Sequence, residues 1–261
     1  PDVHGTGAQR TVVPADATSY RSNFEAFEAA RNPKGQAILI NSPNKPSGAV
    51  NSAQTLTKLA AILEAKQQEY GHDIFLISDE PYREIVFDGN TQPYPARFYA
   101  NTLTCYSFSK SLSLPGERIG YVAVNPKATD ADLLVPMMGQ ISRGTGHNCP
   151  PSSIQLGVAK VIDETSDLSV YETNMNLLYD ALTSLGFDVV RPGGTFYIFP
   201  QALEEDATAF CMKAKDYDLI LVPSESFGVP GYFRMAYCID TEKVKRSIGA
   251  LERFVHEQYG K

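Results

Sequence analysis

The sequence predicts an α/β fold with a mainly parallel sheet, followed by a smaller α+β domain at the C-terminal end. From residue 37 to about residue 124, short apolar runs without polar alternation are joined by a helical segment, as is typical of parallel strands covered on both faces. After Gly186, short strand-like runs are interleaved with helices. The length of 261 residues allows two modest domains, which we place at 1–150 and 151–261.

The first predicted domain contains four strand-like runs and one clear helix. The runs are AILI (37–40), IFLIS (74–78), LTCYSF (103–108) and IGYVAV (119–124). Between the first two, apolar residues recur at helical spacing (Leu56, Leu59, Ala60 and Leu63), and Gly71 is a plausible stop. The Pro- and Gly-rich stretch 136–151 indicates a change of organisation.

The second predicted domain mixes helices with short strands. Helices are expected near 152–163, at 167–185, near 206–216 and at 241–258, and strands at FDVV (187–190), GGTFYIF (193–199), LILVP (219–223) and YFRMAY (232–237). In the helix at 167–185, one face carries Met175, Leu178, Leu182 and Leu185.

Composition excludes several classes of partner. The net charge of −7 and the pI near 5.2 argue against a nucleic-acid surface, and no apolar run approaches the ~20 residues that span a bilayer. The histidines are isolated from one another (His4, His72, His147 and His256), so no metal site is expected. The cysteines form no CxxC pair, and we expect reduced, mostly buried thiols in a cytosolic protein (Cys105, Cys149, Cys211 and Cys238).

Three polar segments follow the predicted strands: 41–48, 79–82 and 107–110. Because ligands bind beyond the carboxyl ends of strands in α/β sheets, these segments are expected to converge. Lys110 follows a buried-type strand and is flanked by hydroxyls. A surface role is the commoner one for a lysine, but a partly desolvated lysine has a lowered pKa and forms Schiff bases with carbonyls.

Two other residues supply complementary charges. Asp79 is either a turn former or a buried carboxylate, and Arg118 is either a surface partner of Glu117 or Glu84 or a phosphate ligand beside serine hydroxyls. A Schiff-base lysine, an aspartate for a pyridinium nitrogen and an Arg/Ser phosphate clamp together describe a pyridoxal phosphate site.

Four motifs carry a family resemblance: NSPNKPSG (41–48), SDEPYREIVFDG (78–89), SFSKSLSLPGERIGY (107–121) and YFRMAYC (232–238). In this order they resemble the class I/II aminotransferases of the fold-type I pyridoxal-phosphate-dependent family, over nearly the whole chain. The resemblance implies part of the large domain and the C-terminal small domain of that fold. It also implies pyridoxal 5'-phosphate as cofactor, amino acid and 2-oxo acid substrates, and a cytoplasmic homodimer when full length, without nucleic-acid or membrane partners.

The resemblance assigns roles to the residues of the lysine site. Lys110 resembles the lysine that forms the Schiff base with the cofactor. Asp79 resembles the partner of the pyridine nitrogen, and Tyr82 the phenol that hydrogen-bonds the cofactor O3′.

The resemblance also implies two anion contacts. Ser107 and Arg118 resemble the phosphate ligands, with Ser109 a weaker candidate. Arg234 resembles the arginine that binds the substrate α-carboxylate, although an edge-strand surface arginine is its simpler interpretation.

Two departures from the family pattern stand out. The family usually has Asn directly before the Pro-Thr-Gly turn, where this chain has Lys45. Family members also have an N-terminal portion with a glycine-rich turn and an aromatic that stacks on the cofactor ring. Here the chain opens with PDVHGTGAQRTVV, so we expect the natural domain to begin upstream.

The leading hypothesis is an aminotransferase that moves an amino group from an L-amino acid, with aspartate-type substrates among the candidates, to a 2-oxo acid through a Lys110 Schiff base. One alternative is a pyridoxal-phosphate-dependent C–S lyase or decarboxylase. Another is the aminotransferase-like domain of a transcription regulator. A third is that the chain as given is inactive and binds the cofactor weakly.

Overall fold

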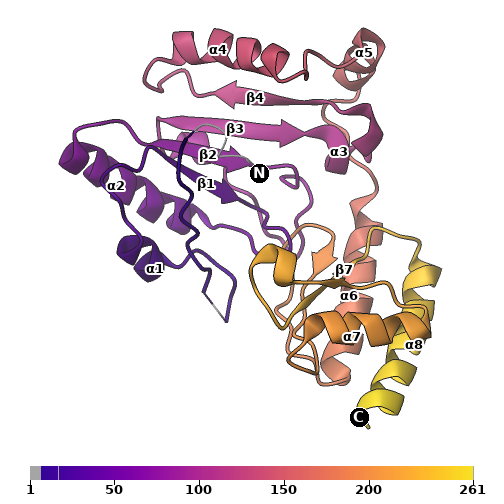
Figure 1. Cartoon of the computed structure of the whole chain (residues 1–261). Helices are drawn as coiled ribbons and strands as arrows, with labels where there is room; N and C mark the ends of the chain where they lie inside the picture. Colours follow the sequence, from indigo (N-terminus) through magenta and orange to yellow (C-terminus); the bar gives the residue numbers. More distant parts are fainter. Residues whose placement is uncertain (1–6, 17, 261) are drawn as a thin grey trace.

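The computed structural model of the chain describes residues 7–16 and 18–260. His4 and the opening PDVHGT lie outside the described residues. Figure 1 shows two lobes, one built around a sheet and one in which helices surround short strands.

The sheet of the first lobe has four strands in the order β1-β2-β3-β4. They are β1 (Ala37–Asn41), β2 (Phe75–Asp79), β3 (Thr102–Ser107) and β4 (Gly120–Val124). The first three are parallel and β4 is antiparallel to β3. Asn41 lies opposite Asp79, which lies opposite Cys105, so the carboxyl ends of β1, β2 and β3 share one edge. The predicted α/β class with a mainly parallel sheet is confirmed.

The helices of the first lobe are α1 (Phe24–Ala29), α2 (Ala53–Tyr70), α3 (Phe108–Ser111) and α4 (Ala131–Gly144), with short 3-10 turns η2 (Pro95–Arg97) and η3 (Pro115–Glu117). In α2 the Ser52 hydroxyl accepts the Thr55 N–H at 3.1 Å, and Gly71 ends the helix in the left-handed conformation. The predicted apolar face of α2 is buried, at Leu56, Leu59, Ala60 and Leu63.

Two features of this lobe differ from the sequence prediction. The stretch from residue 136 is largely helical, because α4 continues through Pro136. A proline removes only one helical N–H, and the apolar residues around it recur at helical spacing. The sheet is also less covered than predicted. Leu39 on β1 is 66% exposed and Val122 on β4 is 49% exposed, since the described helices leave part of each strand open.

The second lobe is smaller and mixed. Its helices are α6 (Leu168–Ser184), α7 (Ala207–Ala214) and α8 (Thr241–Tyr259), with η4 (Lys215–Tyr217) and η5 (Glu225–Phe227). The preceding helix α5 (Ser152–Ala159) lies with the first lobe, where its Val158 joins a buried cluster with Tyr106, Phe108 and Ile119 (Figure 1). An antiparallel sheet of order β5-β7-β6 joins β5 (Tyr197–Ile198), β7 (Phe233–Ala236) and β6 (Val222–Pro223). The FDVV run at 187–190 forms no strand, and the other predicted strands are shorter than expected.

The largest buried cluster joins residues distant in sequence. It contains Met175, Leu178 and Leu182 of α6, with Phe210, Phe233 and Phe254 from α7, β7 and α8. The same cluster includes Tyr82, Ile85 and Phe87 from the segment after β2. A core therefore connects segments on both sides of residue 150, and the domain boundary there stays a prediction.

The cysteines are less buried than the sequence predicts. All four are free, but only Cys211 is buried, because Cys149 lies in an exposed loop and Cys238 follows the end of β7. Within residues 7–16 and 18–260, no group of three or more metal-ligating side chains gathers. No helix in the described part of the chain has the length and apolarity needed to cross a membrane.

Candidate functional site

The ends of β1 and β2 are tied together by one side chain. Asn41, the last residue of β1, donates from Nδ2 to the Asp79 carbonyl at 2.9 Å and to Asp79 Oδ2 at 3.2 Å. Its Oδ1 accepts the backbone N–H of Lys45 at 2.8 Å. Asn41 thus holds the Asp79 carboxylate and the loop after β1 in one arrangement.

Asp79 is a half-buried carboxylate at the carboxyl end of β2. Burial raises its pKa, and the positive charge of Lys45 opposes that shift. A carboxyl group in this environment binds a proton more readily than one in water, so it is suited to sharing a proton with a basic ring nitrogen.

Ser107 ends β3 and begins the short turn that carries Lys110. Its hydroxyl accepts the Ser109 N–H at 3.2 Å and donates to the Ser109 Oγ at 2.6 Å. The two serine hydroxyls therefore lie side by side, within three residues of the lysine. Both can reorient toward an anion, because hydroxyl groups donate as well as accept.

Lys110 is partly buried between aromatic rings. Its Nζ lies 6.0 Å from the ring centroid of Tyr82 and 5.5 Å from that of Phe196. Burial lowers the pKa of its amine, and the charges of Lys45, Arg118 and Arg234 lower it further, while Cys238 acts in the opposite direction. A lysine with a lowered pKa is a better nucleophile near neutral pH.

Tyr82 forms the apolar wall below this amine. It is 3% exposed and packs edge-to-face against Phe196, with a centroid separation of 5.4 Å. Burial raises the pKa of its phenol, so the hydroxyl stays protonated and can donate a hydrogen bond.

Arg234 lies on β7 with its guanidinium stacked on aromatic rings. The guanidinium carbon is 4.5 Å from the ring centroid of Tyr197 and 5.1 Å from that of Phe227. Its Nε is buried without a hydrogen-bond partner among the described residues. A buried guanidinium donor is costly to leave unpaired, so this geometry suits a carboxylate ligand.

Arg118 lies between η3 and β4, in the segment that follows the Lys110 turn. It adopts φ 51°, in the left-handed region, and its Nη1 donates to the Pro115 carbonyl at 3.0 Å. Among the described residues it forms no ion pair with Glu117 or Glu84, the surface partners that the sequence offered.

Several of the sequence-predicted residues from separate segments lie together. Lys110 lies over the Tyr82 ring, Tyr82 packs edge-to-face against Tyr197, and the Arg234 guanidinium stacks on Tyr197. Sequence reasoning assigned no role to Asn41 or to the aromatic support of Arg234 by Tyr197 and Phe227. The position of Asn41 at the end of a strand parallel to that of Asp79 was the one available signal.

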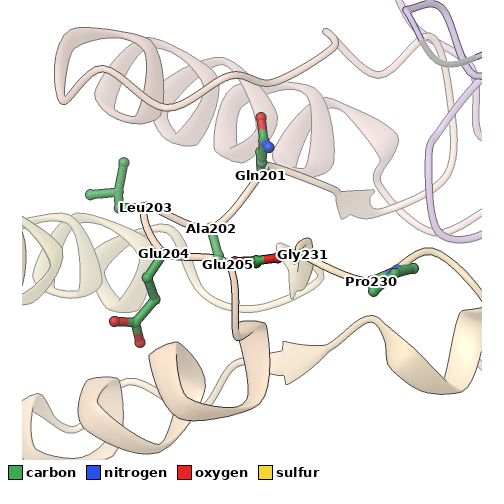
Figure 2. A pocket seen from close by; sticks show the side chains of 7 residues that line it. All are labelled: Gln201, Ala202, Leu203, Glu204, Glu205, Pro230 and Gly231. Atoms are coloured by element: carbon green, nitrogen blue, oxygen red, sulfur yellow. The ribbon is translucent and has the colours of Figure 1, made fainter.

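A surface hollow lies elsewhere. It has a volume of about 510 Å³. Figure 2 shows the residues that line it: Gln201, Ala202, Leu203, Glu204, Glu205, Pro230 and Gly231. Its Glu204 carboxylate is paired with Lys213 at 2.5 Å. The lining contains none of the predicted site residues, so we assign it no part in the chemistry.

Comparison with known proteins decides the family. The model of the family described as "Aminotransferase class I and II" matches residues 2–251. This chain belongs to that family. Among curated relatives of this aminotransferase-family chain, the "Aromatic-amino-acid aminotransferase 2" of Thermococcus litoralis is 28% identical, and the match covers 99% of this chain and 67% of the relative. The "Aspartate aminotransferase" of Geobacillus stearothermophilus is also 28% identical, over 88% of this chain and 60% of the relative.

Solved structures give the same family. The crystal structure of an amino transferase from Eubacterium rectale is 45% identical with a TM-score of 0.93, and covers 99% of this aminotransferase-family chain and 65% of the other. A Thermus thermophilus aspartate aminotransferase mutant is 25% identical with a TM-score of 0.78. The chain thus spans about 60 to 67% of the length of these relatives.

Proposed function

We propose that the protein acts as a pyridoxal-phosphate-dependent aminotransferase. The observation that carries the proposal is the grouping of a partly buried lysine (Lys110), a half-buried carboxylate (Asp79) and an arginine (Arg234) whose buried Nε lacks a hydrogen-bond partner among the described residues, in a chain of the aminotransferase family. The relatives with matching sequence are named as aminotransferases, which supports the same reaction class.

The residues present fit pyridoxal phosphate. Lys110 would hold the aldehyde, Asp79 would face the ring nitrogen and Tyr82 would donate to the ring oxygen. The adjacent hydroxyls of Ser107 and Ser109 can both turn toward a phosphate, and Arg118 would supply its charge. Arg234 is left for the substrate, because its buried Nε has no hydrogen-bond partner in the described part of the chain.

When bound, pyridoxal phosphate supplies an aldehyde that condenses with amines and a ring that withdraws electrons from the substrate Cα. The protein supplies the proton movements and the orientation. Lys110 Nζ would accept the proton from the substrate Cα and return it on the cofactor side, which requires a neutral amine. Asp79 would hold a proton at the ring nitrogen, and Arg234 would fix the α-carboxylate so that the Cα proton faces Lys110.

The substrates proposed are an L-amino acid donor and a 2-oxo acid acceptor. Arg234 recognises the α-carboxylate that all these molecules share. Two relatives are named as aromatic-amino-acid and aspartate aminotransferases, so aspartate and aromatic amino acids are the first donors to test. Amino-group transfer to 2-oxoglutarate supports this proposal, whereas pyruvate with ammonia would indicate the lyase alternative.

The assignment of Lys110 is tested by reductive trapping. The chain is mixed with saturating pyridoxal phosphate, reduced with borohydride and mapped by mass spectrometry. We expect the cofactor mass on the peptide that contains Lys110, and its loss in Lys110→Arg. The matched control is Lys127→Arg, since Lys127 is exposed and follows β4 at the opposite end of the sheet. Equal labelling of Lys110 and Lys127 would contradict the proposal.

A further inference from the structure

The helical turn that carries Lys110 is too short to fix its own orientation. The helix α3 has four residues, Phe108–Ser111, and the bond that closes it is long, from the Leu112 N–H to the Phe108 carbonyl at 3.4 Å. An isolated helical turn is unstable, because one hydrogen bond has to fix the backbone of three residues. The direction in which Lys110 projects therefore depends on the contacts between α3 and the rest of the chain.

Tyr106, the next-to-last residue of β3, contacts α3 at both of its ends. Its hydroxyl lies 2.8 Å from the Ser111 hydroxyl, and both side chains are buried. Its ring packs edge-to-face against Phe108, with a centroid separation of 5.1 Å. Phe108 begins α3 and Ser111 ends it, so one side chain holds the first and the last residue of the turn that contains Lys110.

Tyr106 is itself held by two further contacts. The guanidinium carbon of Arg83 lies 4.7 Å from its ring centroid, and the ring of Tyr121 on β4 stacks on it at 5.2 Å. Arg83 is fixed in turn, because its Nε donates to the buried Glu80 carboxylate at 2.8 Å. Glu80 directly follows Asp79, the last residue of β2. These contacts thus connect the segment after β2 to α3 through the ring of Tyr106.

We propose that Tyr106 is a positioning residue of this site: through its contacts with both ends of α3, it sets the place of the Lys110 amine between two aromatic rings. Tyr106 acts through the residues of α3 and not on the reacting atoms. The inference deepens the proposed function and rests on it, because an aldehyde cofactor requires this amine at a fixed place.

The test measures the protonation of Lys110 in cofactor-free protein. Trace acetic anhydride is applied across a pH series, and the label on the Lys110 peptide is quantified by mass spectrometry. Tyr106→Phe keeps the ring and removes the hydroxyl, and Ser111→Ala breaks the same hydrogen bond from the other side. In both variants we expect the amine to move toward water. The midpoint of Lys110 labelling should then rise by about half a pH unit, which makes labelling roughly threefold slower below the midpoint.

The labelling midpoint reports the place of the amine, because neither substitution changes a charge. Tyr106 itself stays neutral, since burial raises the pKa of its phenol. Both variants retain the charged and titratable groups that act on Lys110, which are Lys45, Arg118, Arg234 and Cys238. A contact that only stabilises the fold would lower the unfolding free energy in urea and leave the labelling midpoint in place.

Tyr94→Phe is the matched control. The Tyr94 hydroxyl accepts a hydrogen bond from Thr104 Oγ1 on β3 at 3.4 Å, and the guanidinium carbon of Arg83 lies 5.4 Å from the Tyr94 ring centroid. The variant therefore removes a phenol hydroxyl that contacts the same strand and whose ring packs against the same arginine, without breaking the bond to α3. We expect it to keep the parent labelling midpoint.

The double variant tests whether the two hydroxyls act through one bond. Tyr106→Phe combined with Ser111→Ala should raise the midpoint no further than either single substitution. The proposal is overturned if the midpoint of either single variant stays in place or falls, or if Tyr94→Phe raises it equally. Should one of the two single variants fail to fold, the other decides.

Reductive trapping separates this inference from the proposed function. A raised labelling midpoint with no trapped cofactor on Lys110 in the parent chain would support the role of Tyr106 in placing this lysine and reject the cofactor. Trapping with an unchanged midpoint in the variants would do the reverse.

Discussion

Burial acts on Asp79 and Lys110 in opposite senses, because it disfavours the charged form of both groups. It raises the pKa of the carboxyl and lowers that of the amine. Both shifts bring the pKa of the group closer to neutral pH, where the group can bind and release a proton. Residues with such perturbed pKa values gather at functional sites, because catalytic acids, bases and nucleophiles need pKa values matched to their task. The burial that produces the shift also costs stability.

The cost at Asp79 gives the first prediction, that Asp79→Asn stabilises the cofactor-free protein at neutral pH. The folded-state pKa of Asp79 is raised above its ordinary value of 3.8, so ionisation is harder in the folded than in the unfolded chain. Stability from this group is present below 3.8 and is lost as the pH rises through the folded-state pKa. Asparagine avoids that loss. Urea unfolding across a pH series measures the difference, which should vanish toward pH 3.8.

Asp163→Asn serves as the control, because Asp163 is exposed in the loop between α5 and α6. It is expected to leave the unfolding free energy at neutral pH unchanged. A loss of stability in Asp79→Asn at neutral pH would show that the ionised carboxylate is favoured in the fold, contrary to the prediction.

Sequence alone identifies Lys110 as the candidate lysine, but it does not predict the contacts that surround it. Lys110 is recognisable because it follows an apolar strand among hydroxyls. The role of Asn41 depends on the register between β1 and β2, which places it opposite Asp79 and is not written in either segment. The support of Arg234 by Tyr197 likewise requires β5 and β7 to pair. Contacts of this kind arise from tertiary structure and have no local pattern.

At the scale of elements, the β3–α3–β4 unit carries Lys110, and its two strands approach each other closely at Gly120. Gly120 faces Ser107 in the antiparallel pair, and a Cβ there would lie 2.3 Å from the Tyr106 carbonyl oxygen. We predict that Gly120→Ala forces the strands apart and lowers the unfolding free energy by about 2 kcal/mol or more. Urea denaturation measures the change.

Gly116→Ala is the matched control on the same loop. Nothing lies within 4 Å of a Cβ at Gly116, so its unfolding free energy should change by no more than about 0.5 kcal/mol. Equal stability of the two variants would mean that β3 and β4 separate without cost.

Elements with strong periodicity are predicted well from the sequence, and those set by tertiary contacts are not. The face of α2 and its stop at Gly71 follow from local pattern and glycine conformation. The helix α4 is not predicted, because Pro136 within it is typical of a helix break. The proline removes one backbone N–H, and the helix continues through it. FDVV at 187–190 has strand-like composition but finds no strand partner, because backbone pairing requires a neighbour that composition does not specify.

At the scale of the whole molecule, the segment after β2 is shared between two structural units. Figure 1 shows β2 in the sheet lobe, while Tyr82, Ile85 and Phe87 belong to the buried cluster of the helical lobe. The Thr195 N–H donates to the Ile85 carbonyl at 2.9 Å, and the Phe87 N–H donates to the Gly193 carbonyl at 3.0 Å. The segment that leads from Asp79 therefore fixes the Lys110 side of the site against the lobe that carries Arg234.

This arrangement predicts that Ile85→Ala weakens the helical lobe although Ile85 precedes it by many residues. Ile85 is fully buried, and removing its side chain should cost about 2–5 kcal/mol. Native-state hydrogen exchange should show lower protection in α6 and α8, and unchanged protection in α2, whose buried residues belong to a separate cluster. Leu39→Ala, at a side chain that is 66% exposed, is the control and should alter neither. If Ile85→Ala loosened α2 and spared α6 and α8, the segment after β2 would belong energetically to the sheet lobe.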